Sequence, residues 1–141
     1  MFIKPLFLIV EDDEDDRDLL KLAYEEGDYD CELVFAEDGH QAIELLQQLH
    51  TLPSIALLDI NMPRMGGLDL LEKIKSSSDW RKMPVLMLST TSRSETISQA
   101  YSMGANSYIV KPNSFRDLHK IWDAVYHFWT RTVQLPPSKA S

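Results

Sequence analysis

The stretch at residues 55–67, IALLDINMPRMGG, places an apolar run, a carboxylate and a turn in immediate succession. The run Ile55–Leu58 has the length and the continuous hydrophobicity of a strand that is buried on both faces. Asp59 follows it directly, and Pro63 and the pair Gly66-Gly67 then favour a tight turn near a ligand. We therefore predict a central strand that delivers Asp59 at its carboxyl end.

Four further apolar runs of strand length occur along the chain. They cover Leu6–Val10, Glu32–Phe35, Val85–Leu88 and Tyr108–Val110. Between and after the five runs, apolar residues recur at helical spacing. These positions fall within residues 19–23, 42–49, 68–74, 97–103 and 118–129. Strand and helix thus alternate five times, which predicts an α/β fold with a parallel sheet covered by helices on both faces.

Helix-ending and helix-capping residues agree with this alternation. Gly27 follows the first helical segment and Gly104 follows the fourth, where a helix commonly stops. Asn113 or Ser114 can cap the fifth helix at its start. The sequence therefore marks helix boundaries where the strand pattern requires them.

Length and composition indicate one domain. With 141 residues, 44% of them hydrophobic, the chain can bury one ordinary core. Pro136 and Pro137 cannot continue a helix, so we expect a domain over residues 1–131 and a short flexible tail over 132–141. The net charge of -8 provides no clustered basic face, which argues against nucleic acid as a partner.

Cysteine usage and hydropathy favour the cytoplasm. Cys31 is the only cysteine, so the chain can form no internal disulfide and has no cysteine-based zinc pattern. The apolar run Leu6–Val10 is followed at once by acids and is far shorter than the ~20 residues that span a bilayer. We expect no membrane segment and a cytoplasmic location.

Charged side chains follow the strands at one edge of the predicted sheet. In an open parallel sheet, ligands bind outside the carboxyl ends of the strands. Glu11 and Asp12 follow the first strand there, and Asp59 follows the third. Two unit charges ~4 Å apart repel by roughly 4 kcal/mol at an effective dielectric constant near 20, so this cluster needs a cation. Mg²⁺, which prefers oxygen ligands and bridges carboxylates to phosphate, is the expected ion.

The same edge contains the parts of a phosphoryl-transfer site. A carboxylate beside a metal ion, without a histidine or cysteine partner, points to attack on phosphorus, and Asp59 is the candidate nucleophile. The backbone carbonyl of Asn61 can add a neutral metal ligand. Lys111 can neutralise phosphoryl oxygens, and the Ser89 hydroxyl can hydrogen-bond another.

Four stretches together resemble the response-regulator receiver family. They are Val10–Asp13, Leu57–Gly67, Pro84–Thr90 and Tyr108–Pro112, each at the end of a predicted strand. The resemblance covers about residues 5 to 130 and includes the stand-alone regulators of the chemotaxis type and the phytochrome-associated type. It implies a flavodoxin-like doubly wound fold with five parallel strands in the order 2-1-3-4-5 and five helices.

The resemblance also implies a role for each site residue. Glu11 and Asp12 are implied as metal-side acids and Asp59 as phosphoacceptor and metal ligand. Ser89 is implied as the switch hydroxyl and Tyr108 as the rotating aromatic. Lys111 is implied as the phosphate-binding cation, followed by a Lys-Pro bond that is often cis in the family.

The implied function is two-component phosphorelay signalling without enzymatic turnover. A histidine kinase would phosphorylate Asp59, and the surface between the fourth helix and the fifth strand would shift between two states. Since only one helix and the tail follow Lys111, we expect the output to pass to a downstream protein partner or a phosphotransfer protein.

Two residues depart from the common family pattern. Glu11 stands where Asp is frequent, which lengthens one metal-side arm. Thr90 is bulkier than the Ala or Gly often found beside the switch hydroxyl. We hypothesise that Thr90 narrows access for the hydrolytic water and prolongs the phosphorylated state.

Several of these residues also have a purely structural explanation. Carboxylates favour a helix N-terminus, which is the preferred explanation for the acids at 14, 15, 16 and 18, and Asp13 can simply cap that helix. Tyr108 is as readily a strand-edge aromatic as a switch. The four histidines, at 40, 50, 119 and 127, lack ligand spacing, and we assign them no chemistry.

The last helical segment has more apolar residues than one helical face can hold. Trp122 and Phe128 cannot share a face with all of the other apolar positions in this segment. Apolar side chains of this segment that stay exposed would favour binding to a partner protein or a homodimer through the last helices.

Two other function classes fit the sheet less well. An aspartate-nucleophile phosphohydrolase usually has a second carboxylate two residues after the nucleophile, where this chain has Asn61. An interaction module that is never phosphorylated would usually have lost Asp59 or Lys111, and both are present. A flavin site would need a phosphate loop rich in Ser, Thr or Gly after the first strand, where this chain has acids.

Overall fold

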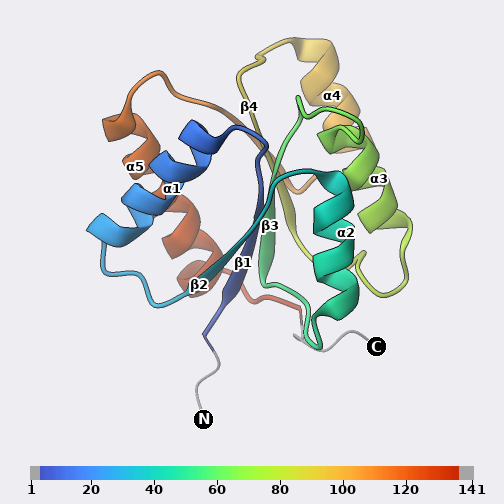
Figure 1. Ribbon diagram of the computed structural model, residues 1–141, viewed down its shortest axis with the longest axis horizontal. Helices are drawn as coiled ribbons and strands as arrows, with labels where there is room; N and C mark the ends of the chain where they lie inside the picture. Colours follow the sequence, from blue (N-terminus) through green and yellow to red (C-terminus); the bar gives the residue numbers. More distant parts are fainter. Residues whose placement is uncertain (1–3, 137–141) are drawn as a thin grey trace.

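The computed structural model describes residues 4–136 and shows a five-stranded parallel sheet between two helical layers (Figure 1). The strands are β1 (Leu6–Val10), β2 (Glu32–Ala36), β3 (Ile55–Asp59), β4 (Val85–Ser89) and β5 (Ser107–Val110). Their spatial order is β2-β1-β3-β4-β5, and every neighbouring pair is parallel. The predicted fold class and strand order are confirmed.

Five helices connect or follow the strands. They are α1 (Glu14–Glu26), α2 (Gly39–Gln48), α3 (Gly67–Ser76), α4 (Ser94–Ser102) and α5 (Phe115–His127). In Figure 1, α1 and α5 cover one face of the sheet, and α2, α3 and α4 cover the other. No described helix has the combined length and hydropathy required to cross a membrane.

The strands are apolar on both faces because each face packs against helices. Phe7 and Ile9 of β1 belong to the core on the α1 and α5 side, whereas Leu8 and Val10 belong to the core on the opposite side. This alternation follows from the two-residue period of a strand. The run Ile55–Asp59 is buried along its whole length, as expected for the central strand.

The caps agree with the sequence and fix where the helices start. The Asp13 side chain accepts hydrogen bonds from the backbone N–H groups of Asp15 and Asp16, and Ser114 caps α5 through the N–H of Asp117. Gly104 has φ +106°, a left-handed conformation that suits the residue just after α4. These caps place the first turns of α1 and α5 beside the carboxyl ends of the strands.

The last helix ends in a wider turn, close to the domain boundary expected at residue 131. A π-helical segment, Phe128–Thr132, extends α5, and the N–H of Val133 donates to the Phe128 carbonyl at 3.0 Å. The Thr130 hydroxyl also donates to the Tyr126 carbonyl at 2.6 Å, which supports this wider turn. Of the expected tail, residues 137–141 lie outside the described part of the chain.

Candidate phosphoryl-transfer and metal site

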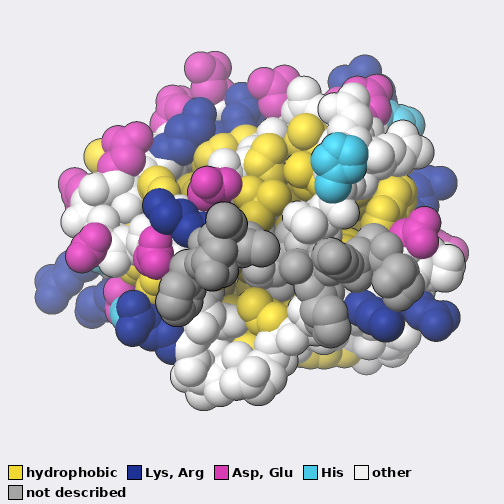
Figure 2. All heavy atoms as spheres, turned by 90° about the horizontal axis from the view of Figure 1, so that it is seen from below, with side chains coloured by type: hydrophobic (Ala, Val, Ile, Leu, Met, Phe, Trp, Pro, Cys, Tyr) yellow, Lys and Arg dark blue, Asp and Glu magenta, His cyan; other side chains and the backbone are white. Residues whose placement is uncertain are grey.

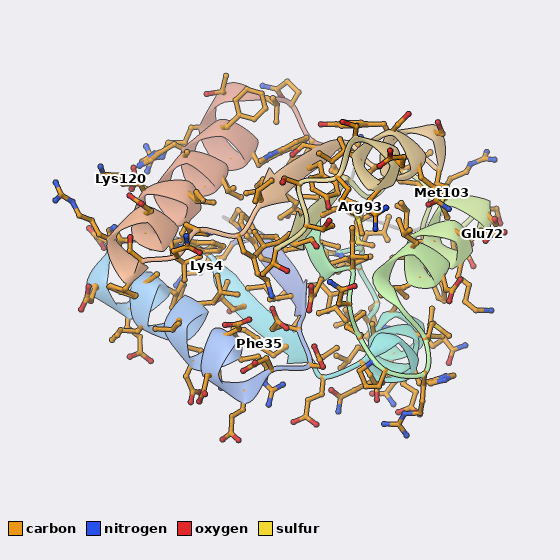
Figure 3. The ribbon with its side chains drawn as sticks, turned by 90° about the horizontal axis from the view of Figure 1, so that it is seen from above. Lys4, Phe35, Glu72, Arg93, Met103 and Lys120 are labelled. Atoms are coloured by element: carbon orange, nitrogen blue, oxygen red, sulfur yellow. The ribbon has the colours of Figure 1, made fainter. Side chains whose placement is uncertain are left out.

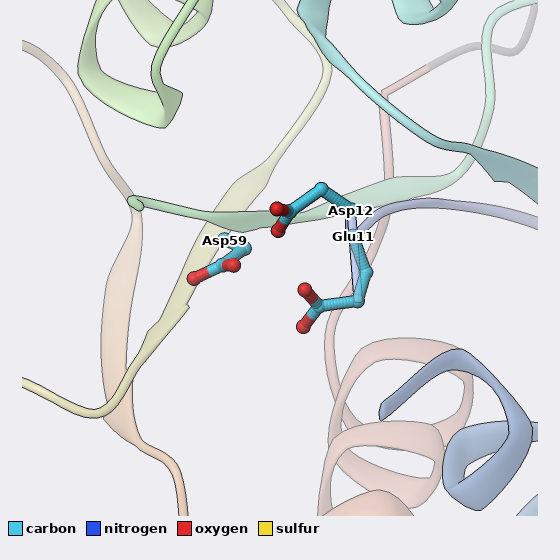
Figure 4. A group of neighbouring side chains, drawn as sticks. All are labelled: Glu11, Asp12 and Asp59. Carbon is cyan, nitrogen blue, oxygen red and sulfur yellow. The ribbon is translucent and has the colours of Figure 1, made fainter. Parts of the chain in front are cut away.

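Three acids meet at the carboxyl ends of β1 and β3. Glu11 and Asp12 follow β1 directly, and Asp59 is the last residue of β3. One carboxylate oxygen from each lies within 4.8 Å of the other two. Figure 4 shows the three carboxyl groups directed toward a shared space. Glu11 and Asp59 are buried, at 2% and 6% exposure, whereas Asp12 is exposed at the mouth.

The oxygen spacing suits a small divalent cation. With metal–oxygen distances of about 2.0–2.1 Å, the oxygens of an octahedral Mg²⁺ site lie roughly 2.9 to 4.2 Å apart. The three carboxylate oxygens, all within 4.8 Å of one another, lie close enough together for one ion to contact all three after side-chain adjustment. Their oxygen-only donor set also suits Mg²⁺ better than it suits a thiolate- or imidazole-preferring metal.

The protonation behaviour of the site also calls for a cation. Burial raises the pKa of Glu11 to about 7, although the hydrogen bond from Lys111 lowers it in part. Burial likewise raises the pKa of Asp59, against the opposing influence of Glu11 and Lys111. Both shifts mean that the buried negative charges are not fully compensated by the side chains around them.

Lys111, directly after β5, is the cation that the fold brings to these acids. Its Nζ lies 2.5 Å from Glu11 Oε1, 3.0 Å from Asp16 Oδ2 and 3.6 Å from Asp59 Oδ2. Burial alone would lower the pKa of Lys111, but the hydrogen bonds to Glu11 and Asp16 outweigh this and raise it above its usual range. Lys111 is therefore a permanent positive charge within reach of Asp59.

The β3–α3 loop folds back tightly on Asp59. The N–H of Asn61 approaches Asp59 Oδ1 at 3.4 Å, and the N–H of Gly67 donates to the Ile60 carbonyl at 2.9 Å. A Cβ atom on Gly67 would lie 2.1 Å from the Asp59 carbonyl oxygen, so only glycine permits this approach. The loop keeps the Asn61 backbone beside the acidic cluster, where its carbonyl was predicted as a metal ligand.

The two candidate switch residues are linked through Thr91. Ser89 is fully buried, and its Oγ accepts the N–H of Thr91 at 3.2 Å. The hydroxyl of half-buried Tyr108 donates to the Thr91 carbonyl at 2.9 Å. The Thr91 backbone, through its N–H and its carbonyl, therefore connects the end of β4 to β5, and no sequence pattern predicts this link.

Two α1 residues contribute more to the site than the sequence predicted. The sequence favours a purely helix-stabilising role for Asp16 at the N-terminus of α1, yet its carboxylate contacts Lys111. Arg17 donates from Nη1 to the carbonyls of Glu11 and Asp12, at 2.8 and 3.0 Å, and so holds the loop that bears the acids. The sequence shows a run of acids followed by an arginine, which does not reveal which of them faces β5.

Within residues 4–136, no second group of three acidic, histidine or cysteine side chains lies this close together. Figure 3 looks down on the site end, with α1 and α5 on one side of the sheet and α2, α3 and α4 on the other. Figure 2 shows the opposite end, where basic and acidic side chains are mixed around apolar ones. The Lys111–Pro112 bond is trans, as is every peptide bond in the described residues.

Comparison with known proteins identifies the family. The model of the response regulator receiver domain matches residues 7–123. The chain belongs to this family, the receiver domains of two-component response regulators.

Individual relatives extend over nearly the whole chain. Response regulator Rcp1 of Synechocystis sp. PCC 6803 is 32% identical over 93% of this chain and 92% of its own length. The probable methanogenesis regulatory protein FilR2 of Methanothrix harundinacea is 33% identical over 88% of this chain and 83% of its own length. The phosphorylated cyanobacterial phytochrome response regulator RcpA superposes with a TM-score of 0.88 at 30% identity, covering 95% of this chain and 99% of that one.

Proposed function

We propose that this protein is a stand-alone phosphorelay receiver, phosphorylated on Asp59 by a histidine kinase in the cytoplasm. The observation that carries the proposal is the convergence of Glu11, Asp12, Asp59 and Lys111 from three separate strand ends. Membership in the receiver family supports it, as do the solved Mn(2+)-bound form of Rcp1 and the phosphorylated form of RcpA.

The proposed reaction is an in-line phosphoryl transfer. An Asp59 carboxylate oxygen attacks phosphorus, the phosphorus–nitrogen bond of the kinase phosphohistidine breaks, and its electron pair remains on the imidazole nitrogen. A bound Mg²⁺, held by Glu11, Asp12, Asp59 and the Asn61 carbonyl, would neutralise charge that develops on the transferring group. Lys111 would donate to a phosphoryl oxygen, and Ser89 would hydrogen-bond another.

The proposed output is a change in a protein-interaction surface rather than catalytic turnover. Ser89 would follow the phosphoryl group, and Tyr108 would change its contact with the Thr91 carbonyl. The surface between α4 and β5 would then shift toward a state with different affinity for a downstream partner or a phosphotransfer protein.

We propose residues 1–131 as the receiver domain and residues 132–141 as a flexible tail.

We also propose that the end of α5 contacts a second copy of this chain. Phe128 is 48% exposed and packs edge to face with Trp129, at 5.4 Å between ring centroids. Trp122, by contrast, is buried, so the surplus apolar surface of the last helix is concentrated at its end.

Intact mass measurement after incubation with acetyl phosphate and Mg²⁺ tests the phosphoacceptor. The wild-type protein is expected to gain one phosphoryl group, and Asp59→Asn is expected to gain none. Equal modification of the two proteins would contradict the proposal. A generic phosphate ester, offered to the same samples, should show no turnover, whereas steady hydrolysis would favour a phosphohydrolase.

A further inference from the structure

The ammonium group of Lys111 is shared among three carboxylates that come from three elements. Glu11 and Asp16 lie at hydrogen-bonding distance from Nζ, at 2.5 and 3.0 Å, while Asp59 lies at 3.6 Å. Lysine has three N–H donors, so two are used by Glu11 and Asp16, and the third is available toward Asp59. The side chain of Asp16 is 38% exposed and that of Lys111 is 13% exposed.

Glu11 cannot offer its full negative charge to Lys111 and to a metal ion at the same time. It belongs to the acidic cluster with Asp12 and Asp59, and it is also the nearest partner of Lys111. When its carboxylate is a metal ligand, its negative charge is shared with the cation, and the attraction for Lys111 weakens. Asp16 lies outside that cluster and keeps its full charge for Lys111.

The first turn of α1 is fastened to the same loop as the acids. The Asp13 side chain accepts the N–H of Asp16 at 3.2 Å. The next residue, Arg17, donates from Nη1 to the carbonyls of Glu11 and Asp12. Its Nη2 lies 3.6 Å from Glu37 Oε1. These contacts fix the backbone of the first turn of α1, from which the Asp16 carboxylate reaches Lys111.

We propose that Asp16 is a positioning residue that keeps Lys111 beside Asp59 while Glu11 is engaged by the metal ion. The inference rests on the proposed phosphorylation of Asp59. Asp16 acts through Lys111 and does not touch the phosphoryl group itself. In the metal-bound site, Glu11 and Asp59 share their charge with the cation. Without Asp16, no carboxylate that is free of the metal ion would lie beside the Lys111 ammonium group.

The test compares Asp16→Asn with Asp15→Asn, which removes the same charge from the same helical turn. The Asp15 side chain forms no ion pair or hydrogen bond among the described residues. With Mg²⁺ present, beryllofluoride affinity and the rate of phosphorylation by acetyl phosphate should fall about two- to fivefold in Asp16→Asn, the range for a partly exposed ion pair. Asp15→Asn should match the wild type, and Asp16→Glu should recover part of the loss.

The NMR signal of the Lys111 ammonium group gives a readout that does not depend on phosphorylation. In Mg²⁺-loaded protein, it should shift or broaden in Asp16→Asn and remain unchanged in Asp15→Asn. Faster phosphorylation of Asp16→Asn would mean that Asp16 only repels the anionic donor, which overturns the inference. Unchanged kinetics with a lower melting temperature would reduce Asp16 to a helix-stabilising acid and would also overturn it. Failure of the proposed function appears differently, as an unmodified wild-type protein.

Discussion

At the scale of single residues, Glu11 combines a buried carboxylate, a lysine partner and a place in the acidic cluster. Its pKa is raised to about 7 by burial, so it retains a proton in the folded, metal-free protein at mildly acidic pH. An acid whose folded-state pKa is raised contributes most to stability below its unfolded pKa, and that contribution is lost as the pH rises toward 7. The affinity for a metal ion, which needs the ionised Glu11 carboxylate, should instead increase as the pH rises.

We therefore expect Mg²⁺ affinity to increase as the pH is raised from 5 to 7 and to level off above 7. If one proton is released on binding, the increase is at most about tenfold per pH unit. Isothermal titration calorimetry in two buffers of different ionisation enthalpy measures both the affinity and the released protons. Glu11→Gln should reduce the proton release, since the pKa of Asp59 is also raised and this carboxylate can still lose a proton. A pH-independent affinity of the wild type would contradict the assignment of Glu11.

Thr90 provides a second prediction at this scale. It is exposed at the end of β4, next to the fully buried Ser89. If Thr90 restricts the approach of water to the acyl phosphate, Thr90→Ala should shorten its lifetime, as measured by loss of the phosphorylated mass after removal of the donor. An unchanged rate of dephosphorylation would show that Thr90 does not have this role.

The reactivity of Cys31 gives a third prediction for a single residue. Cys31 is buried, and burial raises the pKa of its thiol to about 11. Because the thiolate is the reactive form, the native protein at pH 8 should react with a thiol reagent far more slowly than the unfolded protein. Rapid stoichiometric labelling of the native protein would show that Cys31 is accessible.

At the scale of the elements, the turn from β3 into α3 depends on one glycine of a pair. A Cβ on Gly67 would meet the Asp59 and Ile60 backbone at 2.1 to 2.8 Å, whereas a Cβ on Gly66 would come no closer than 3.4 Å to the Ile60 carbonyl. Gly67→Ala should therefore lower the free energy of unfolding by about 1–3 kcal/mol or more, the cost of overpacking. Gly66→Ala is the matched control and should be close to neutral in urea denaturation, so equal losses would contradict this account.

The sequence could predict the strands and the residues that follow them, because the strands are short and continuously apolar and parallel strands end at one edge. It could not predict that Asp16 faces Lys111, since a run of acids at a helix start is equally explained by capping and by the helix dipole. The conformation and the ion pair of Arg64 could not be predicted either. Its φ is +65°, which is uncommon for a residue other than glycine. Its guanidinium pairs with the Asp38 carboxylate at 3.2 Å. This contact joins loops 26 residues apart, and no local pattern indicates it.

At the scale of the whole molecule, the exposed end of α5 is expected to support self-association. Phe128→Ser should weaken association by at least about tenfold, as loss of an interface aromatic commonly does. Leu22→Ser on α1 is the control, because Leu22 is similarly exposed at 42% but lies on another helix. Light scattering over a concentration series, with and without beryllofluoride, measures the effect. A monomeric mass throughout would contradict the proposed contact.

The central claim is that Asp59 is the residue that carries the phosphoryl group, and its acyl phosphate can be trapped chemically. Borohydride reduces an acyl phosphate to the alcohol but leaves free carboxylates intact, so a phosphorylated aspartate becomes homoserine. After treatment with acetyl phosphate and Mg²⁺, peptide mass spectrometry should find homoserine at position 59 and aspartate at position 12. Homoserine at position 12, or at any acid other than Asp59, would contradict the account.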